Sequence, residues 1–213
     1  LVEEYLRGPE FSVETLTVHG EHHVVGVTRK LLGPLPHFVE QGHLFGEPDT
    51  AGTRQVAALA VELLDAVGYQ CGPAHTEVIL TADGPRIVES QARLGGDKIP
   101  DIVELATGLD LRREIFAALA GRTPRPAPAR AVGHIAYLSL PPGVLRSVSG
   151  VDEARALDFV HTVSFPFSVG DVIPPTVDSK TRHGFVILTG ADTAQALARA
   201  DQVRGLIQVE VTR

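Results

Sequence analysis

The 213-residue sequence contains no methionine, no tryptophan and a single cysteine, Cys71. One cysteine cannot form a disulfide within the chain and cannot supply the several thiolates of a typical structural zinc site. We expect Cys71 to be a small buried residue. Because no initiator methionine is present, we expect the sequence to be part of a longer chain.

Positive charge is also scarce, since 19 Lys and Arg residues stand against 26 Asp and Glu residues, giving a net charge of -7. A nucleic-acid surface requires clustered Lys and Arg side chains, so nucleic acid is not an expected partner. No apolar run approaches the roughly 20 residues of a membrane-spanning helix, and no charged-then-apolar leader is present. We therefore expect a cytoplasmic protein without a membrane partner.

The order of apolar and turn residues predicts an α+β fold with mostly antiparallel strands. The stretch 121–131, rich in proline and arginine, is typical of a stiff linker and divides residues 1–120 from 132–213. In the first part we expect a hairpin within 1–30, a short strand near 37–40, a helix over 49–67, a hairpin turning at Asp83-Gly84, and two helices within 99–120. In the second part we expect strands near 133–140, 145–148, 160–165 and 184–188, helices near 151–157 and 193–204, and a final strand.

The second hairpin carries Glu77 on one strand and Glu89 on the next, with Gln91 two residues further. Side chains alternate between faces along a strand, so Glu89 and Gln91 point the same way and Glu77 can lie beside them. Two carboxylates at such a distance repel unless a cation lies between them. Carboxylate oxygens are hard ligands, which Mg²⁺ prefers. A Mg²⁺ ion held by only one or two carboxylates usually also binds the phosphate oxygens of a substrate.

A solvated ribbon face is the alternative explanation for this Glu pair. The following segment, ARLGGDKIP, favours a site, because Arg93 can hold a carboxylate or a transferring phosphoryl group. Gly95 and Gly96 allow the backbone to approach a ligand. His75 should share a face with Glu77, which leaves both ordinary packing and a role as a phosphate partner open.

Residues 2–14 read VEEYLRGPEFSVE. Taken alone, Glu3, Glu4 and Glu10 are typical of solvated edge positions. Together with HTEVILTADGPRIVESQARLGGDKIPDIV, however, this stretch resembles the C-terminal lobe of ATP-grasp carboxylate–amine ligases, and most resembles the L-amino acid ligases that make dipeptides. The likeness covers about residues 1–120. The region after Gly133 is more weakly similar to the small C-terminal α+β domain of those ligases.

The resemblance implies ATP and Mg²⁺ or Mn²⁺ as cofactors, and a fold made of the C-terminal ATP-grasp lobe followed by that small domain. It implies an amide or peptide bond formed through an acyl phosphate from a small carboxylate and an amine. The residues to which it assigns roles are Glu3, Glu4 and Leu6 around adenine, Glu10 at the ribose, Lys30 near the phosphates, Glu77, Glu89 and Gln91 at the metal, Arg93 at the acyl phosphate, Gly96 at the substrate carboxylate, and Glu40 and His43 near the amino end of the substrate. The face that His75 shares with Glu77, and not the resemblance, makes His75 a further candidate for substrate binding.

One position departs from the family pattern, which usually has Asn where this chain has Gln91, so direct metal ligation by the longer amide stays open. Two alternative functions also stay open. One is an ATP-grasp carboxylase or purine-pathway ligase, and the other is a nucleotide-binding module without catalysis. A homodimer is compatible with the sequence, which does not decide it.

Overall fold

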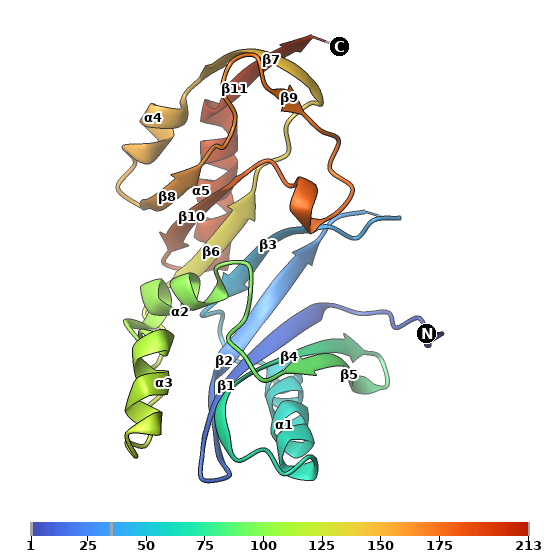
Figure 1. Cartoon of the computed structure of the whole chain (residues 1–213), viewed down its shortest axis with the longest axis vertical. Coiled ribbons are helices and arrows are strands. Elements are labelled where there is room, and N and C mark those ends of the chain that lie inside the picture. Colours follow the sequence, from blue (N-terminus) through green and yellow to red (C-terminus); the bar gives the residue numbers. More distant parts are fainter. Residues whose placement is uncertain (1, 35, 213) are drawn as a thin grey trace. The chain divides into compact units, whose positions relative to one another are not determined.

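The computed structural model describes residues 2–34 and 36–212 (Figure 1). The chain forms two compact units, Leu1–Lys30 with Phe45–Arg130 and Leu31–Leu44 with Ala131–Arg213. The second unit thus takes in an early segment of the chain. The domain limits predicted from the sequence stay a prediction, because compactness alone does not define the limits of a homologous domain.

The first unit contains an antiparallel sheet in the strand order β5-β4-β1-β2. Its elements are β1 (Glu10–Val18), β2 (Glu21–Leu32, whose last two residues belong to the second unit), β4 (Cys71–Thr81), β5 (Gly84–Gln91), α1 (Ala51–Ala66), α2 (Ile99–Thr107) and α3 (Leu111–Leu119). Both predicted hairpins are present. The β1–β2 turn has positive φ at His19 and Gly20, as a two-residue primed turn requires.

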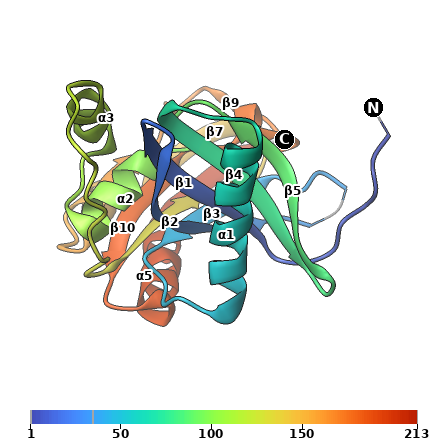
Figure 2. The ribbon, with the colours of Figure 1, turned by 90° about the horizontal axis from the view of Figure 1, so that it is seen from below.

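Helix α1 covers one face of this sheet, as Figures 1 and 2 show. The Thr50 side chain accepts a hydrogen bond from the Thr53 backbone and caps the first turn. Gly68 follows the end of the helix with φ of 66°, a left-handed backbone conformation that costs little for glycine. The buried stripe of α1 packs against alternate residues of the strands, and this core comprises Val56, Ala60, Phe11, Val13 and Val78.

The second unit contains strands in the order β3-β6-β10-β8 and a smaller sheet in the order β11-β7-β9. Its elements are β3 (Glu40–Phe45, whose last residue belongs to the first unit), β6 (Val132–Tyr137), β7 (Gly143–Ser149), α4 (Val151–Arg155), β8 (Val160–Ser164), β9 (Val172–Ile173), the 3-10 turn η1 (Ser179–Thr181), β10 (Phe185–Gly190), α5 (Thr193–Leu206) and β11 (Gln208–Thr212). Helix α5 buries Ala196, Ala200 and Val203 in a core that includes Val186 and Leu188.

Two local expectations were wrong. The strand expected near 37–40 is β3, which begins at Glu40, because Pro34 and Pro36 lack the N–H that a strand ladder uses. Cys71 is exposed and not buried. It is the first residue of β4 and pairs with Val18, the last residue of β1, so it lies at an open end of the sheet.

The predicted fold class is confirmed, because antiparallel sheets with accompanying helices make up both units. In the residues that the structure describes, no helix is long and apolar enough to cross a membrane.

Candidate functional site

Strand β1 presents two chemically different faces. Phe11 and Val13 belong to the core under α1. Glu10, Ser12 and Glu14 alternate with them and therefore point to the other face of the sheet. We call the part of this second face around Glu10, Ser12 and Glu14 the polar face, and it carries the chemistry described below.

Cross-strand pairing extends the polar face over all four strands. Residues directly opposite one another share a face and have neighbouring side chains. They form two rows, with Thr28, Ser12, Glu77 and Glu89 in the first and Gly26, Glu14, His75 and Gln91 in the second. Glu77 and Glu89 are therefore direct neighbours in the first row, with Glu89 on the edge strand β5.

Lys30 links two carboxylates of the polar face. Its side chain is 6% exposed, and its Nζ forms ion pairs with Glu10 and, at 2.8 Å, with Glu77 Oε2. Burial opposes the charge of Lys30, but the hydrogen bonds and charges of Glu10 and Glu77 outweigh burial and raise its pKa above the ordinary value. Lys30 is thus held as a cation.

His75 bridges Glu77 to a second, deeper carboxylate. Its Nδ1 lies 2.6 Å from Glu14 Oε1 and its Nε2 lies 3.2 Å from Glu77 Oε1. Burial disfavours the imidazolium, yet the two carboxylates outweigh burial and raise the pKa of His75 to about 9. Burial likewise opposes the charge of Glu77, but His75 and Lys30 lower its pKa to about 2. Near neutral pH both ring nitrogens of His75 therefore donate.

An exposed chain of hydrogen bonds runs from Glu89 toward the next loop. Gln91 Nε2 donates to Glu89 Oε1 at 2.9 Å, and Arg93 Nε donates to Gln91 Oε1. Arg93 Nη1 also donates to the Leu94 carbonyl at 2.8 Å. Gly96 is exposed in the same loop, and its carbonyl accepts from Ile99 at the start of α2. The structure thus gathers these predicted residues beside the polar face.

The residues predicted at the adenine precede the sheet. Glu3 and Glu4 are exposed and Leu6 is half-buried, in a stretch without regular secondary structure before β1. Glu10 begins β1 and joins the polar face through Lys30.

Glu40 and His43 belong to the second unit, on β3. A cavity of about 420 Å³ in this unit is lined by Glu40, Tyr137 and Arg182, among others. Arg182 is 11% exposed, lies 3.7 Å above the Tyr137 ring centroid, and has Nη1 3.8 Å from Glu40 Oε2. His43 is 1% exposed, packs edge-on against Tyr137 and is absent from the cavity wall. The sequence reasoning missed Arg182 and Tyr137, which no local pattern marks.

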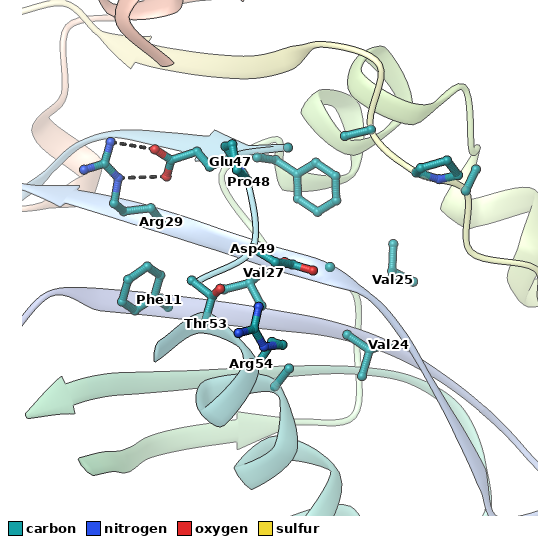
Figure 3. A pocket seen from close by; sticks show the side chains of 17 residues that line it. Phe11, Val24, Val25, Val27, Arg29, Glu47, Pro48, Asp49, Thr53 and Arg54 are labelled. Carbon is teal, nitrogen blue, oxygen red and sulfur yellow. Dashed lines mark hydrogen bonds and ion pairs between the residues drawn. The ribbon is translucent and has the colours of Figure 1, made fainter. Parts of the chain in front are cut away.

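Another cavity, of about 500 Å³, is lined partly by the apolar face of the first sheet (Figure 3). Phe11 and Val27 contribute to its wall, and Arg29 and Glu47 form a two-bond ion pair beside them, at 2.8 and 2.9 Å. None of the polar-face carboxylates lines this cavity. Its size therefore does not identify it as the place of the chemistry.

The polar face fits a metal ion that arrives with phosphates. Across residues 2–34 and 36–212, no three His, Cys, Asp or Glu side chains are gathered as a ready metal centre. Glu77 and Glu89 would supply hard oxygen ligands, with the amide of Gln91 close by, and the remaining positions would fall to phosphate oxygens and water. Because Lys30 and His75 already balance the negative charge of Glu77, a bare cation would bind there less favourably than a cation that carries a bound phosphate.

Comparison with known families gives two matches along the chain. Residues 1–101 match the model of the ATP-grasp domain, and residues 136–212 match that of the L-amino acid ligase C-terminal domain 2. Together with the likeness to L-amino acid ligases, this confirms the resemblance inferred from the sequence.

Two curated proteins are similar to this chain. An uncharacterised protein of Sinorhizobium fredii is 30% identical over 92% of this chain and 41% of its own length. Dapdiamide A synthase of Enterobacter agglomerans is 25% identical over 88% of this chain and 46% of its own length. The chain thus spans less than half the length of both relatives.

Solved structures agree on the ATP-grasp fold. The L-amino acid ligase of Bacillus licheniformis has a TM-score of 0.85 at 23% identity, over 98% of this chain and 53% of its own. Phosphoribosylglycinamide synthetase of Anaerococcus prevotii has a TM-score of 0.83 at 16% identity, over 98% of this chain and 55% of its own. At these identities the likeness concerns the fold alone.

Proposed function

We propose that this chain contributes the metal-binding and phosphate-transfer part of an ATP-dependent ligase that joins a carboxylate to an amine, with amino-acid-like molecules as its substrates. The observation that carries the proposal is the direct cross-strand pairing of Glu77 with Glu89, with Lys30 and His75 both bound to Glu77. The ATP-grasp domain match supports ATP as the phosphate donor.

Glu77, Glu89 and Gln91 would hold the metal ion. Bound Mg²⁺ or Mn²⁺ would neutralise phosphate charge and orient the phosphates for transfer. Lys30 would bring a fixed positive charge to the phosphate end of the nucleotide. His75 would bring a second positive charge near the phosphates while its Nε2 donates to Glu77, and this contact supports such a role over ordinary packing.

The stretch before β1 would bind the rest of the nucleotide. Glu3, Glu4 and Leu6 would line the adenine, using an extended backbone for its edge and a half-buried side chain for its ring. Glu10 would hold the ribose hydroxyls. Because Glu10 is also paired with Lys30, it would connect the sugar end of the site to the phosphate end.

The reaction would proceed in two transfers. A substrate carboxylate oxygen attacks the γ-phosphorus of ATP, the bond to the β,γ-bridging oxygen breaks, and ADP leaves. An amine nitrogen then attacks the carbonyl carbon of the acyl phosphate, the carbon–oxygen bond to phosphate breaks, and the nitrogen loses a proton. Arg93 would grip the transferring phosphoryl group, with the backbone of Gly96 at the substrate carboxylate.

The second unit would receive the amino end of a substrate. Glu40 lines the 420 Å³ cavity and would bind an ammonium group or accept the proton released from it. Arg182 on the same wall offers a guanidinium for a carboxylate, so the wall matches both charges of an amino acid. His43 is buried behind Tyr137, so it would support this wall rather than take the proton itself.

The proposal is tested by screening the complete gene product with Mg²⁺ and ATP against amino acids, singly and in pairs. Phosphate release and amide formation are followed together. Amino-acid-dependent phosphate release with stoichiometric amide supports the ligase. Release that depends instead on bicarbonate or on a sugar-phosphate amine supports an ATP-grasp carboxylase or purine-pathway ligase, a reading favoured by the fold shared with phosphoribosylglycinamide synthetase. ATP binding without any stimulated release would support a non-catalytic nucleotide-binding module.

A further inference from the structure

Glu14 is a buried carboxylate to which the proposed reaction assigns no role. Its side chain is 2% exposed, in the second row of the polar face. It accepts hydrogen bonds from Ser12 Oγ at 3.1 Å, from His75 Nδ1 at 2.6 Å and from the Gly95 backbone N–H at 3.3 Å. Both carboxylate oxygens are therefore engaged by protein donors.

Stability alone does not explain a charge in this place. Removing a carboxylate from water is costly, and its attraction to a buried cation often only offsets that cost. Apolar residues of similar volume would pack the same space as well or better. What the Glu14–His75 pair provides in addition is direction, because the bond at Nδ1 fixes the ring and aims Nε2 at Glu77.

The third donor to Glu14 connects the pair to the loop that carries Arg93. A Cβ placed on Gly95 would lie 3.0 Å from Glu14 Oε1 and 3.0 Å from His75 Nδ1. The Gly95 backbone therefore rests directly on the Glu14–His75 pair, with no room for a side chain. Glu14 thus contacts both His75, which supports Glu77, and the loop that follows Arg93.

We propose that Glu14 is a positioning residue that fixes the His75–Glu77 contact and the Gly95 segment relative to each other, so that the metal-binding carboxylates and Arg93 keep one geometry. This inference rests on the proposed function for its kinetic consequences. Its structural consequence, the anchoring of Gly95, holds whether or not the chain takes part in catalysis.

Substitution Glu14→Gln tests the proposal, because the amide nearly keeps the shape but turns one acceptor into a donor facing other donors. In the chain itself, amide hydrogen exchange at Gly95, followed by NMR, should rise about tenfold or more while the β1 and α1 amides remain protected. In the complete gene product, kcat for ATP turnover should fall about 10- to 100-fold, as for other supports of metal ligands. The Mg²⁺ concentration for half-maximal rate should rise as well, while KM for ATP changes by less than about threefold.

Gly95→Ala disturbs the same contact, because its added Cβ would press on Glu14 and His75. It should also raise the Mg²⁺ concentration needed for half-maximal rate. The double variant should lose less than the product of the two single losses, because both substitutions break one contact. Glu62→Gln, on the exposed side of α1, is the matched control and should change none of these quantities.

Three results would overturn the positioning role. These are unchanged Gly95 exchange in Glu14→Gln, a loss of rate that follows a lower melting temperature with an unchanged Mg²⁺ requirement, and fully multiplicative effects of the two substitutions. If the unsubstituted gene product turns over no ATP with any acceptor, the proposed function fails. The Gly95 exchange measurement then decides the positioning role by itself.

Discussion

The two units handle charge in opposite ways. On the polar face of the first unit, His75 and Lys30 contact Glu14 and Glu77 at 2.6 to 3.2 Å, so the charges bind one another. On the cavity wall of the second unit, Arg182 Nη1 lies 3.8 Å from Glu40 Oε2, and both side chains line the cavity of about 420 Å³. The first cluster is held together by short contacts between its own charges, whereas the second borders space that a ligand could enter.

This difference separates two chemical tasks. Groups that stabilise charge developing during a reaction work best when they are already oriented, because no reorganisation is then needed as the reaction proceeds. Groups that select a ligand need room for it, and a cavity wall with charges of both signs suits a molecule that carries both charges. We therefore expect substitutions on the polar face to act on rate, and substitutions on the cavity wall to act on substrate affinity.

The largest effect is expected from Glu89→Gln. Its carboxylate is exposed, so its loss should leave the melting temperature unchanged. As one of two proposed metal ligands, its removal should lower ATP turnover about 100- to 1,000-fold, comparable to the loss of one key electrostatic stabiliser. Steady-state ADP release measures this, with Glu62→Gln as control. Unchanged ADP release would show that Glu89 is not a metal ligand. It would also contradict the expectation that substitutions on the polar face act on rate.

Arg93→Lys should have the next largest effect. Lysine keeps the charge but loses the planar fork that grips two oxygens at once. We expect amide formation to fall about 10- to 100-fold while nucleotide affinity stays within about threefold. Amide formed and phosphate released should be measured in the same samples. Equal losses in nucleotide binding and in amide formation would assign Arg93 to the nucleotide instead.

How far the sequence predicted this site depends on the distance between the partners along the chain. The Asp83-Gly84 turn signal and strand alternation were enough to predict Glu77 beside Glu89, which are 12 positions apart and paired in the hairpin. The same alternation in EFSVE puts Glu14 on the face of Glu10, a signal that was available but not used. The Glu14–His75 contact joins residues 61 positions apart, and the register of β1 on β4 that creates it has no local signature.

The polar face should also make stability depend on pH. The pKa of His75 is raised from 6.5 to about 9, so its contribution is fully present below about pH 6.5 and is lost as pH rises through 9. The pKa of Glu77 is lowered from 4.5 to about 2, so its contribution is present above about pH 4.5 and is lost as pH falls through 2.

Urea unfolding of the chain and of His75→Gln tests the alkaline part of this dependence. The stability advantage of the unsubstituted chain should shrink by on the order of 1–3 kcal/mol between about pH 6 and about pH 10. An advantage that is constant over this range would mean that His75 is not held as an imidazolium.

The smallest effect is expected on the cavity wall, from Glu40→Gln. The amide keeps the size of the side chain and can still accept from Ser179 Oγ, which donates to Glu40 Oε2 at 3.0 Å, so the fold should be unaffected. The lost charge should raise KM for the amino-acid substrate about tenfold, the effect of roughly 1.4 kcal/mol of binding energy, with little change in KM for ATP.

Arg182→Gln should weaken binding of the same substrate but not binding of an analogue whose carboxylate is amidated, whereas Glu40→Gln should weaken binding of both. This pattern would assign the two charges of one ligand to the two side chains. If either substitution instead lowers kcat and leaves every KM unchanged, the second unit acts on rate, and the division of tasks between the units is wrong.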